Sequence, residues 1–196
     1  NRAGAPVHLD LQARIEQVTS RNVIAQTRTG RTDNVVMAGA HLDSVPDGAG
    51  INDNGSGTAG LLETALKLGG SPETNNAIRF AFWGAEESGL VGSTRYVRGL
   101  SFEEQLDIAL YLNFDMIGSP NAGYFAYDGD GSDGENDPGP VGSGRIEQDF
   151  VDAMAANGVE LEGTAFDGRS DYGEFIAAGI PSGGLFTGGD EVKTEE

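Results

Sequence analysis

Five side chains in this sequence are of the types that bind divalent metal ions and activate water. They are His41, Asp53, the adjacent pair Glu86 and Glu87, and Asp115. Gathering these carboxylates around one imidazole would be very unfavourable unless a cation neutralised them. One imidazole with several carboxylates suits Zn²⁺, and the carboxylates are numerous enough for two ions bridged by one oxygen ligand. The residue types therefore predict a divalent metal site.

Asp43 follows His41 by two residues, so the two side chains point to the same side of an extended chain. With this spacing, the Asp43 carboxylate could accept a hydrogen bond from the second ring N–H of a metal-bound His41. A histidine and an aspartate at this spacing are weak evidence when taken alone. In the alternative interpretation the loop is merely polar, and Asp53 or Ser56 caps the helix that follows.

The two adjacent glutamates suggest two different roles at the site. Neighbours in an extended chain point apart, so Glu86 and Glu87 suit a pair in which one binds metal and the other faces the substrate as a base. The alternative is an exposed acidic helix N-terminus, which the helix dipole favours.

The elements that must position these residues form an alternating pattern. Short apolar runs predict buried strands, and apolar residues at helical spacing predict helices. The strands are expected at 6–12, 22–27, 35–40, 78–83, 108–114 and ending at 185–186, and the helices at 56–68, 90–97, 145–157 and opening within 168–175. This alternation predicts an α/β fold with a mostly parallel central sheet sandwiched by helices. Ligands bind at the carboxyl ends of such strands, which is where the candidate residues lie.

Composition narrows the class of protein. A chain of 196 residues fits one domain. Its net charge of −19 argues against nucleic acid or an anionic membrane as a partner, because both would repel it. No apolar run is long enough to span a bilayer. The absence of cysteine excludes disulfides, cysteine-based metal sites and a cysteine nucleophile within these residues.

An acidic, glycine-rich loop is predicted at 128–144. Its sequence DGDGSDG resembles a calcium-binding loop, but the EF-hand register fails because Asp133 and Gly139 stand where glycine and glutamate are required. We expect a solvated surface loop, with a weak Ca²⁺ site as the alternative.

Six motifs, in order, resemble the signatures of the zinc aminopeptidases of family M28, of the aminopeptidase S and Y type. They are HLDS, GINDNGSG, FAFWGAEESGLVGS, LNFDMIGSPN, GRSDYGEF and GGLFTG, and the similarity runs from about residue 22 to about residue 187. The resemblance implies the zinc-dependent exopeptidase (phosphorylase/hydrolase-like) fold. It also implies a secreted, monomeric enzyme that hydrolyses the N-terminal peptide bond of peptides.

The resemblance also implies roles for individual residues. Asp53 would bridge two zinc ions, His41 and Asp115 would complete the shell of one ion, and Glu87 would bind the other. Glu86 would be the general base, and the peptide bond between Asp53 and Asn54 would be cis. The substrate's N-terminal side chain would lie in a pocket with an apolar preference, lined by Met116, Gly168, Arg169 and Phe186.

The sequence departs from the family pattern in one respect. The second zinc ion of the family takes a ligand from a histidine in a C-terminal Tyr-His pair, whereas this sequence has only His8 and His41. One zinc site is therefore expected to be complete and the other to lack a ligand. We interpret 1–196 as a single, incomplete peptidase domain of low activity, with 1–21 as the return from a missing inserted domain. The alternatives are a binding domain without catalysis and a glutaminyl cyclase-like transferase with one zinc ion.

Overall fold

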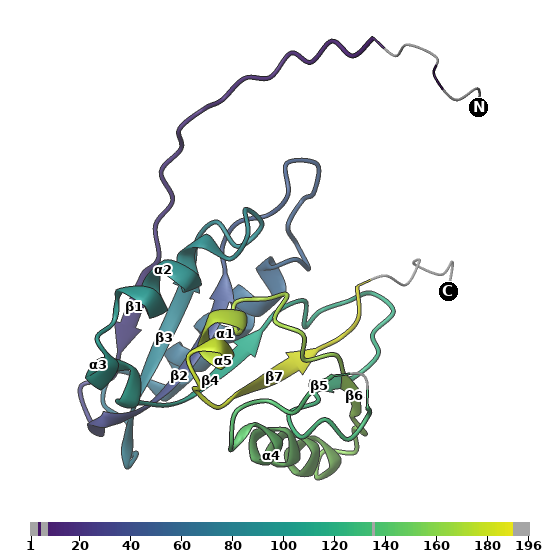
Figure 1. Ribbon diagram of the computed structural model, residues 1–196. Helices are drawn as coiled ribbons and strands as arrows, with labels where there is room; N and C mark the ends of the chain where they lie inside the picture. Colours follow the sequence, from purple (N-terminus) through teal and green to yellow (C-terminus); the bar gives the residue numbers. More distant parts are fainter. Residues whose placement is uncertain (1–3, 5–7, 135, 190–196) are drawn as a thin grey trace.

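A seven-stranded sheet forms the centre of the computed structural model, which describes residues 4, 8–134 and 136–189. The strand order is β1-β3-β2-β4-β7-β5-β6 (Figure 1). The strands are β1 (Val23–Gln26), β2 (Arg31–His41), β3 (Asn76–Trp83), β4 (Ile108–Phe114), β5 (Phe125–Tyr127), β6 (Glu162–Thr164) and β7 (Ser182–Phe186). Strands β3, β2, β4 and β7 run parallel, while β1 and β5 pair antiparallel with β3 and β7. The predicted α/β fold with a mostly parallel sheet is confirmed.

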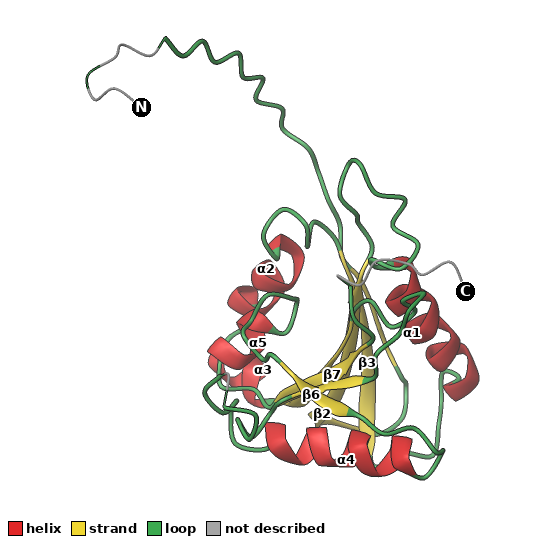
Figure 2. Cartoon of the chain, turned by 90° about the vertical axis from the view of Figure 1, so that its right-hand side faces the viewer, coloured by secondary structure: helices red, strands yellow, loops and turns green. Residues whose placement is uncertain are grey.

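Helices cover both faces of this sheet, as Figure 2 shows. They are α1 (Gly55–Leu68), α2 (Val91–Gly99), α3 (Phe102–Leu106), α4 (Ser143–Ala155) and α5 (Gly173–Ala177). Helix α1 lies against β2, β3 and β4, and α2 and α5 pack together on the opposite side of the sheet. In the described part of the chain, no helix combines the length and apolarity that crossing a bilayer would require.

Two apolar clusters fill the spaces between sheet and helices. Met37, Trp83 and Tyr111 point to one face of the sheet and pack with Phe175 of α5. The strand side chains that alternate with them, Ala38, Ala40 and Phe80, form the second cluster together with Leu61 of α1. Successive strand residues point to opposite faces, so a strand covered on both faces has an unbroken apolar sequence. This explains the apolar runs that identified β2, β3 and β4.

The strand predicted at 6–12 is wrong for residues 8–12, and residues 6 and 7 lie outside the described residues. Residues 8–22 have no regular structure and lead away from the sheet (Figure 1). Leu9 and Leu11 alternate as a strand would, but they are 74% and 80% exposed. Alternation alone does not make a strand, because the backbone also needs a neighbouring strand for its hydrogen bonds.

The other predicted elements are confirmed. Strands predicted at 22–27, 35–40, 78–83 and 108–114 correspond to β1 to β4, and the one ending at 185–186 corresponds to β7. The helices predicted at 56–68, 90–97, 145–157 and within 168–175 correspond to α1, α2, α4 and α5. Helix α3 and the three-residue strands β5 and β6 were not predicted, because such short segments have too few residues to show a period.

The packing of Phe175 gives the first prediction. Its ring is fully buried and stacks on Tyr111, with ring centroids 3.9 Å apart and an interplanar angle of 4°. We expect Phe175→Ala to lower the free energy of unfolding by about 3–5 kcal/mol in urea denaturation, because it leaves a cavity in the larger cluster. The control is Phe102→Ala, at a ring that is 69% exposed, which should change it by about 0.5 kcal/mol or less. Equal losses in the two variants would contradict this account of the core.

Candidate metal centre

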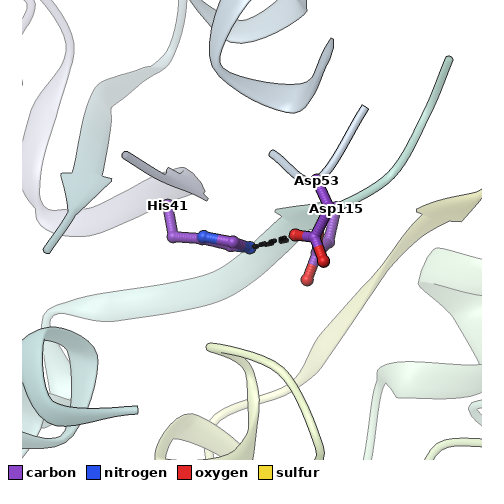
Figure 3. A group of neighbouring side chains, drawn as sticks. All are labelled: His41, Asp53 and Asp115. Atoms are coloured by element: carbon purple, nitrogen blue, oxygen red, sulfur yellow. Dashed lines mark hydrogen bonds and ion pairs between the residues drawn. The ribbon is translucent and has the colours of Figure 1, made fainter. Parts of the chain in front are cut away.

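Three side chains meet at the carboxyl ends of the central parallel strands: His41, Asp53 and Asp115 (Figure 3). His41 is the last residue of β2, Asp53 precedes α1, and Asp115 follows β4. The His41 Nε2 atom lies 3.1 Å from Asp53 Oδ1 and 3.2 Å from Asp115 Oδ1. One ligand atom from each residue lies within 4.8 Å of the other two, so a single cation could contact all three.

Asn54 holds Asp53 in place beside the end of β4. Its Nδ2 donates a hydrogen bond to the Phe114 carbonyl (3.0 Å), and its Oδ1 accepts one from the Gly57 N–H (2.9 Å), which caps α1. The cap is therefore Asn54, rather than Asp53 or Ser56, and the Asp53 carboxylate faces His41 instead. The Asp53–Asn54 peptide bond is cis, as the resemblance implied.

The imidazole of His41 is oriented by the main chain of Asp43. Its Nδ1 lies 3.0 Å from the Asp43 carbonyl oxygen, and because a carbonyl only accepts, Nδ1 must carry the proton. Nε2 is thereby left facing the acids. The partner differs from the one expected, since the nearest Asp43 carboxylate oxygen is 3.8 Å from Nδ1.

The Asp43 carboxylate instead binds the loop after β3. Its two oxygens accept hydrogen bonds from the backbone N–H groups of Glu86 (2.9 Å) and Glu87 (3.2 Å). These amides lie in an irregular turn, where an acceptor from elsewhere must satisfy them. Asp43 thus joins the loop that carries His41 to the loop that carries both glutamates.

The two glutamates occupy different environments. The Glu86 side chain is only 11% exposed, and its Oε2 lies 4.0 Å from His41 Nε2. Glu87 is outside the three-residue group, but its Oε1 is buried and has no hydrogen-bond partner among the described residues. A buried carboxylate oxygen without a donor is costly, and a cation at this position would remove the cost.

The pKa values of these groups report a shortage of positive charge. Burial raises the pKa of Glu86 to about 8, and it also raises the pKa of Asp53, to which the charge of Asp115 adds. Burial disfavours the imidazolium of His41, but its hydrogen bond to Asp115 and the charges of Asp115 and Glu86 outweigh burial and raise its pKa to about 10. In the metal-free chain a proton therefore supplies the charge that a bound cation would replace.

Asp171 is a neighbouring acid that the sequence analysis did not single out. It is 1% exposed, and burial raises its pKa to about 7. Neither carboxylate oxygen has a hydrogen bond of normal geometry among the described residues, although the Ser93 hydroxyl is close. Its neighbour Ser170 donates a hydrogen bond to Asp115 Oδ2 (2.6 Å). The only signal in the sequence was the motif GRSDYGEF, in which both residues stand.

A cleft of about 400 Å³ opens beside Asp53 and Asp115. Three of the four residues expected to contact substrate line it, namely Met116, Arg169 and Phe186. Gly168 does not belong to this lining; it borders a separate cavity next to Phe166. Its neighbours on both sides, Asp167 and Arg169, line the cleft, while Gly168 itself has a left-handed backbone (φ +83°).

A second group of acids lies between the acidic loop and helix α4. Oxygens of Asp128, Asp130 and Glu147 lie within 4.8 Å of one another. Most of this charge already has donors, because Asp128 accepts hydrogen bonds from the N–H groups of Ser132 and Asp133, and Glu147 accepts one from Gly129. Backbone amides can therefore stabilise this group without a cation.

Comparison with proteins of known structure finds chains that share this fold. A zinc aminopeptidase from Bacillus subtilis, BSAP, is 32% identical and superimposes with a TM-score of 0.71, over 89% of this chain and 42% of that one. A glutaminyl cyclase from an Acidobacteriales bacterium is 22% identical with a TM-score of 0.64, over 84% of this chain and 57% of that one. At that identity the likeness extends to the fold alone.

Proteins with similar sequences are also described as aminopeptidases. The probable lipoprotein aminopeptidase LpqL of Mycobacterium tuberculosis is 57% identical over 195 residues, which are 97% of this chain and 39% of the relative. An aminopeptidase of Pseudomonas aeruginosa is 55% identical over 190 residues, 97% of this chain and 35% of the relative. The chain thus spans under two fifths of the length of these relatives. The sequence profile of Peptidase family M28 matches residues 22–194, and the chain therefore belongs to peptidase family M28.

Proposed function

We propose that the protein to which this chain belongs is a zinc-dependent aminopeptidase. The observation that carries the proposal is the convergence of His41, Asp53 and Asp115 beside a cleft at the carboxyl edge of the sheet. Family membership and the names of its relatives, including leucine aminopeptidase 2 of Arthroderma otae, support the same reaction. The substrate class is peptides with a free N-terminus.

His41, Asp53 and Asp115 would hold one zinc ion, since imidazole and carboxylate are zinc ligands and the group lacks positive charge. Glu87 would bind a second ion bridged by Asp53, which accords with its unpaired buried oxygen. The sequence has one other histidine, His8, and it lies in the exposed segment before β1. We therefore propose one complete site and one incomplete site within this chain. When bound, zinc supplies Lewis acidity to the scissile carbonyl and makes water available as a nucleophile near neutral pH.

Glu86 would act as the general base. Its carboxylate would take a proton from the attacking water and return it to the nitrogen of the leaving amine, work typically worth about 10²–10⁴ in rate. Burial favours this role, because it raises the pKa of Glu86 and so strengthens its carboxylate as a proton acceptor. The Asp43 carboxylate would keep the carboxyl group in position by holding the backbone N–H of Glu86.

The cleft and the surrounding charge suggest what the enzyme selects. Met116 and Phe186 offer apolar surface to the substrate's first side chain, which favours an apolar N-terminal residue. The excess of carboxylates would attract the positive α-amino group of a free N-terminus. Together these contacts would restrict cleavage to the first peptide bond.

One relative is described as a lipoprotein, which supports action at the cell envelope or outside the cell.

The glutaminyl cyclase alternative makes a different product. An aminopeptidase would release leucine from a chromogenic amide, whereas a glutaminyl cyclase would form pyroglutamate from a glutaminyl peptide. A binding domain without catalysis would give neither product.

Replacing the proposed base tests its role. We expect Glu86→Gln in the full natural protein to lower kcat for leucine amides by about 10²–10⁴, because the amide cannot accept the proton. Zinc content by mass spectrometry should stay as in the wild type. Glu103→Gln, at an exposed position on α3, is the matched control and should leave both quantities unchanged. Loss of zinc in Glu86→Gln would assign this residue to metal binding instead.

Removing a proposed ligand tests the metal site. Asp53→Ala should reduce the zinc retained after dialysis to less than half of the wild-type content, because Asp53 would contact both ions. Asp149→Ala, which removes an exposed carboxylate on α4, is the control and should retain zinc normally. An Asp53→Ala protein with full zinc content would refute the proposed centre.

A further inference from the structure

Four hydrogen bonds, of which the first three are buried, run in series toward Asp115 at the candidate metal centre. The Trp83 Nε1–H donates to the Tyr111 hydroxyl (2.8 Å), and that hydroxyl donates to Asn113 Oδ1 (3.1 Å). The Asn113 Nδ2 donates to the Ser170 hydroxyl (2.9 Å), which donates in turn to Asp115 Oδ2 (2.6 Å). The series therefore ends on a candidate metal ligand.

The two ends of this series fix its direction. The indole N–H of Trp83 can only donate, and an ionised carboxylate such as that of Asp115 can only accept. The phenol, amide and hydroxyl between them can each donate and accept. With a donor at one end and an acceptor at the other, all four bonds are satisfied only when each group donates toward Asp115.

Burial makes this direction costly to change. Trp83 and Tyr111 are fully buried, and Asn113 is 1% exposed, so water cannot replace a missing partner. Burial also raises the pKa of Tyr111 well above its usual value, so the phenol keeps its proton. Gly39 of β2 makes the necessary room, since a Cβ atom there would overlap both the Tyr111 hydroxyl and Trp83 Nε1.

We propose that Trp83, Tyr111 and Asn113 are positioning residues that aim Asp115 at the metal. Their hydrogen bonds keep the Asn113 amide turned so that the Ser170 hydroxyl donates to Asp115 Oδ2. Oδ1 is then left facing His41 Nε2, at 3.2 Å. This inference rests on the zinc site of the proposed function.

The reverse orientation explains why the direction matters. If the Asn113 amide flipped, its oxygen would face Ser170 and would take the hydroxyl proton that now goes to Asp115. The Asp115 carboxylate would lose the hydrogen bond from Ser170, and it could rotate away from His41. Groups that orient a metal ligand in this way typically contribute 10–100-fold in metal affinity.

Tyr111→Phe tests the proposal in the full natural protein. We expect the zinc dissociation constant, measured by competition with a chromophoric chelator, to rise about tenfold. The lower end of the range applies because Asn113 keeps its own hydrogen bond to the Ser170 hydroxyl. The visible absorption bands of the Co²⁺-substituted protein should shift as well, since they report the ligand geometry directly.

Tyr96→Phe is the matched control. Tyr96 belongs to the same aromatic cluster, with its ring centroid 5.2 Å from that of Trp83, and its hydroxyl is bonded to Arg79 rather than to the series. This variant should change the thermal stability of the metal-free protein without changing the zinc dissociation constant. If Tyr111→Phe does the same, the residue is merely structural and the proposal is overturned.

Ser170→Ala keeps the proposal testable even if Tyr111→Phe does not fold. It removes only one hydroxyl, and it should raise the dissociation constant at least tenfold; an unchanged constant would overturn the proposal. In the double variant, Tyr111→Phe should add less than twofold to Ser170→Ala, because both act through one bond. Independent, multiplicative effects would also overturn it. A wild-type protein that binds no zinc would instead refute the proposed function.

Discussion

Several buried carboxylates around one imidazole cannot all carry their charge without a cation, and the architecture of this edge of the sheet depends on that constraint. Without a cation, the hydrogen bond to Asp115 and the neighbouring acids outweigh burial and raise the pKa of His41 to about 10, while burial raises that of Glu86 to about 8. Each shift returns positive charge or removes negative charge. A divalent ion bound here would displace these protons and supply the positive charge itself, since metal ligands must be deprotonated to bind.

The sheet produces this concentration of charge through its topology. β2, β3 and β4 run parallel, so their carboxyl ends meet at one edge although they lie far apart in the sequence. His41, Glu86 and Asp115 each come at or just after one of these ends. The aromatic cluster that packs against the sheet is buried, and the hydrogen-bond donors that lead to Asp115 start from it. The same side chains thus stabilise the fold and orient the site.

The sequence was sufficient to predict that His41, Asp53 and Asp115 would lie together, because the ends of parallel strands meet at one edge. It could not predict how they contact one another. His41 bonds to the carbonyl of Asp43 rather than to its carboxylate, a choice that depends on the unpaired amides after β3. Asp171 escaped notice because its importance comes from burial, which no local pattern reveals. The strand predicted at 6–12 fails over residues 8–12 for a similar reason, since pairing requires a neighbour that the sequence does not identify.

The two hydrogen bonds from the loop after β3 to Asp43 involve the backbone of that loop and not its side chains. The Asp43 carboxylate accepts hydrogen bonds from the backbone N–H groups of residues 86 and 87, so the two glutamate side chains stay available for other contacts. The path of this loop is therefore independent of which side chains it displays. An engineer could exchange the groups at these two positions for a different reactive pair and expect the backbone to present the new pair at the same point of the cleft.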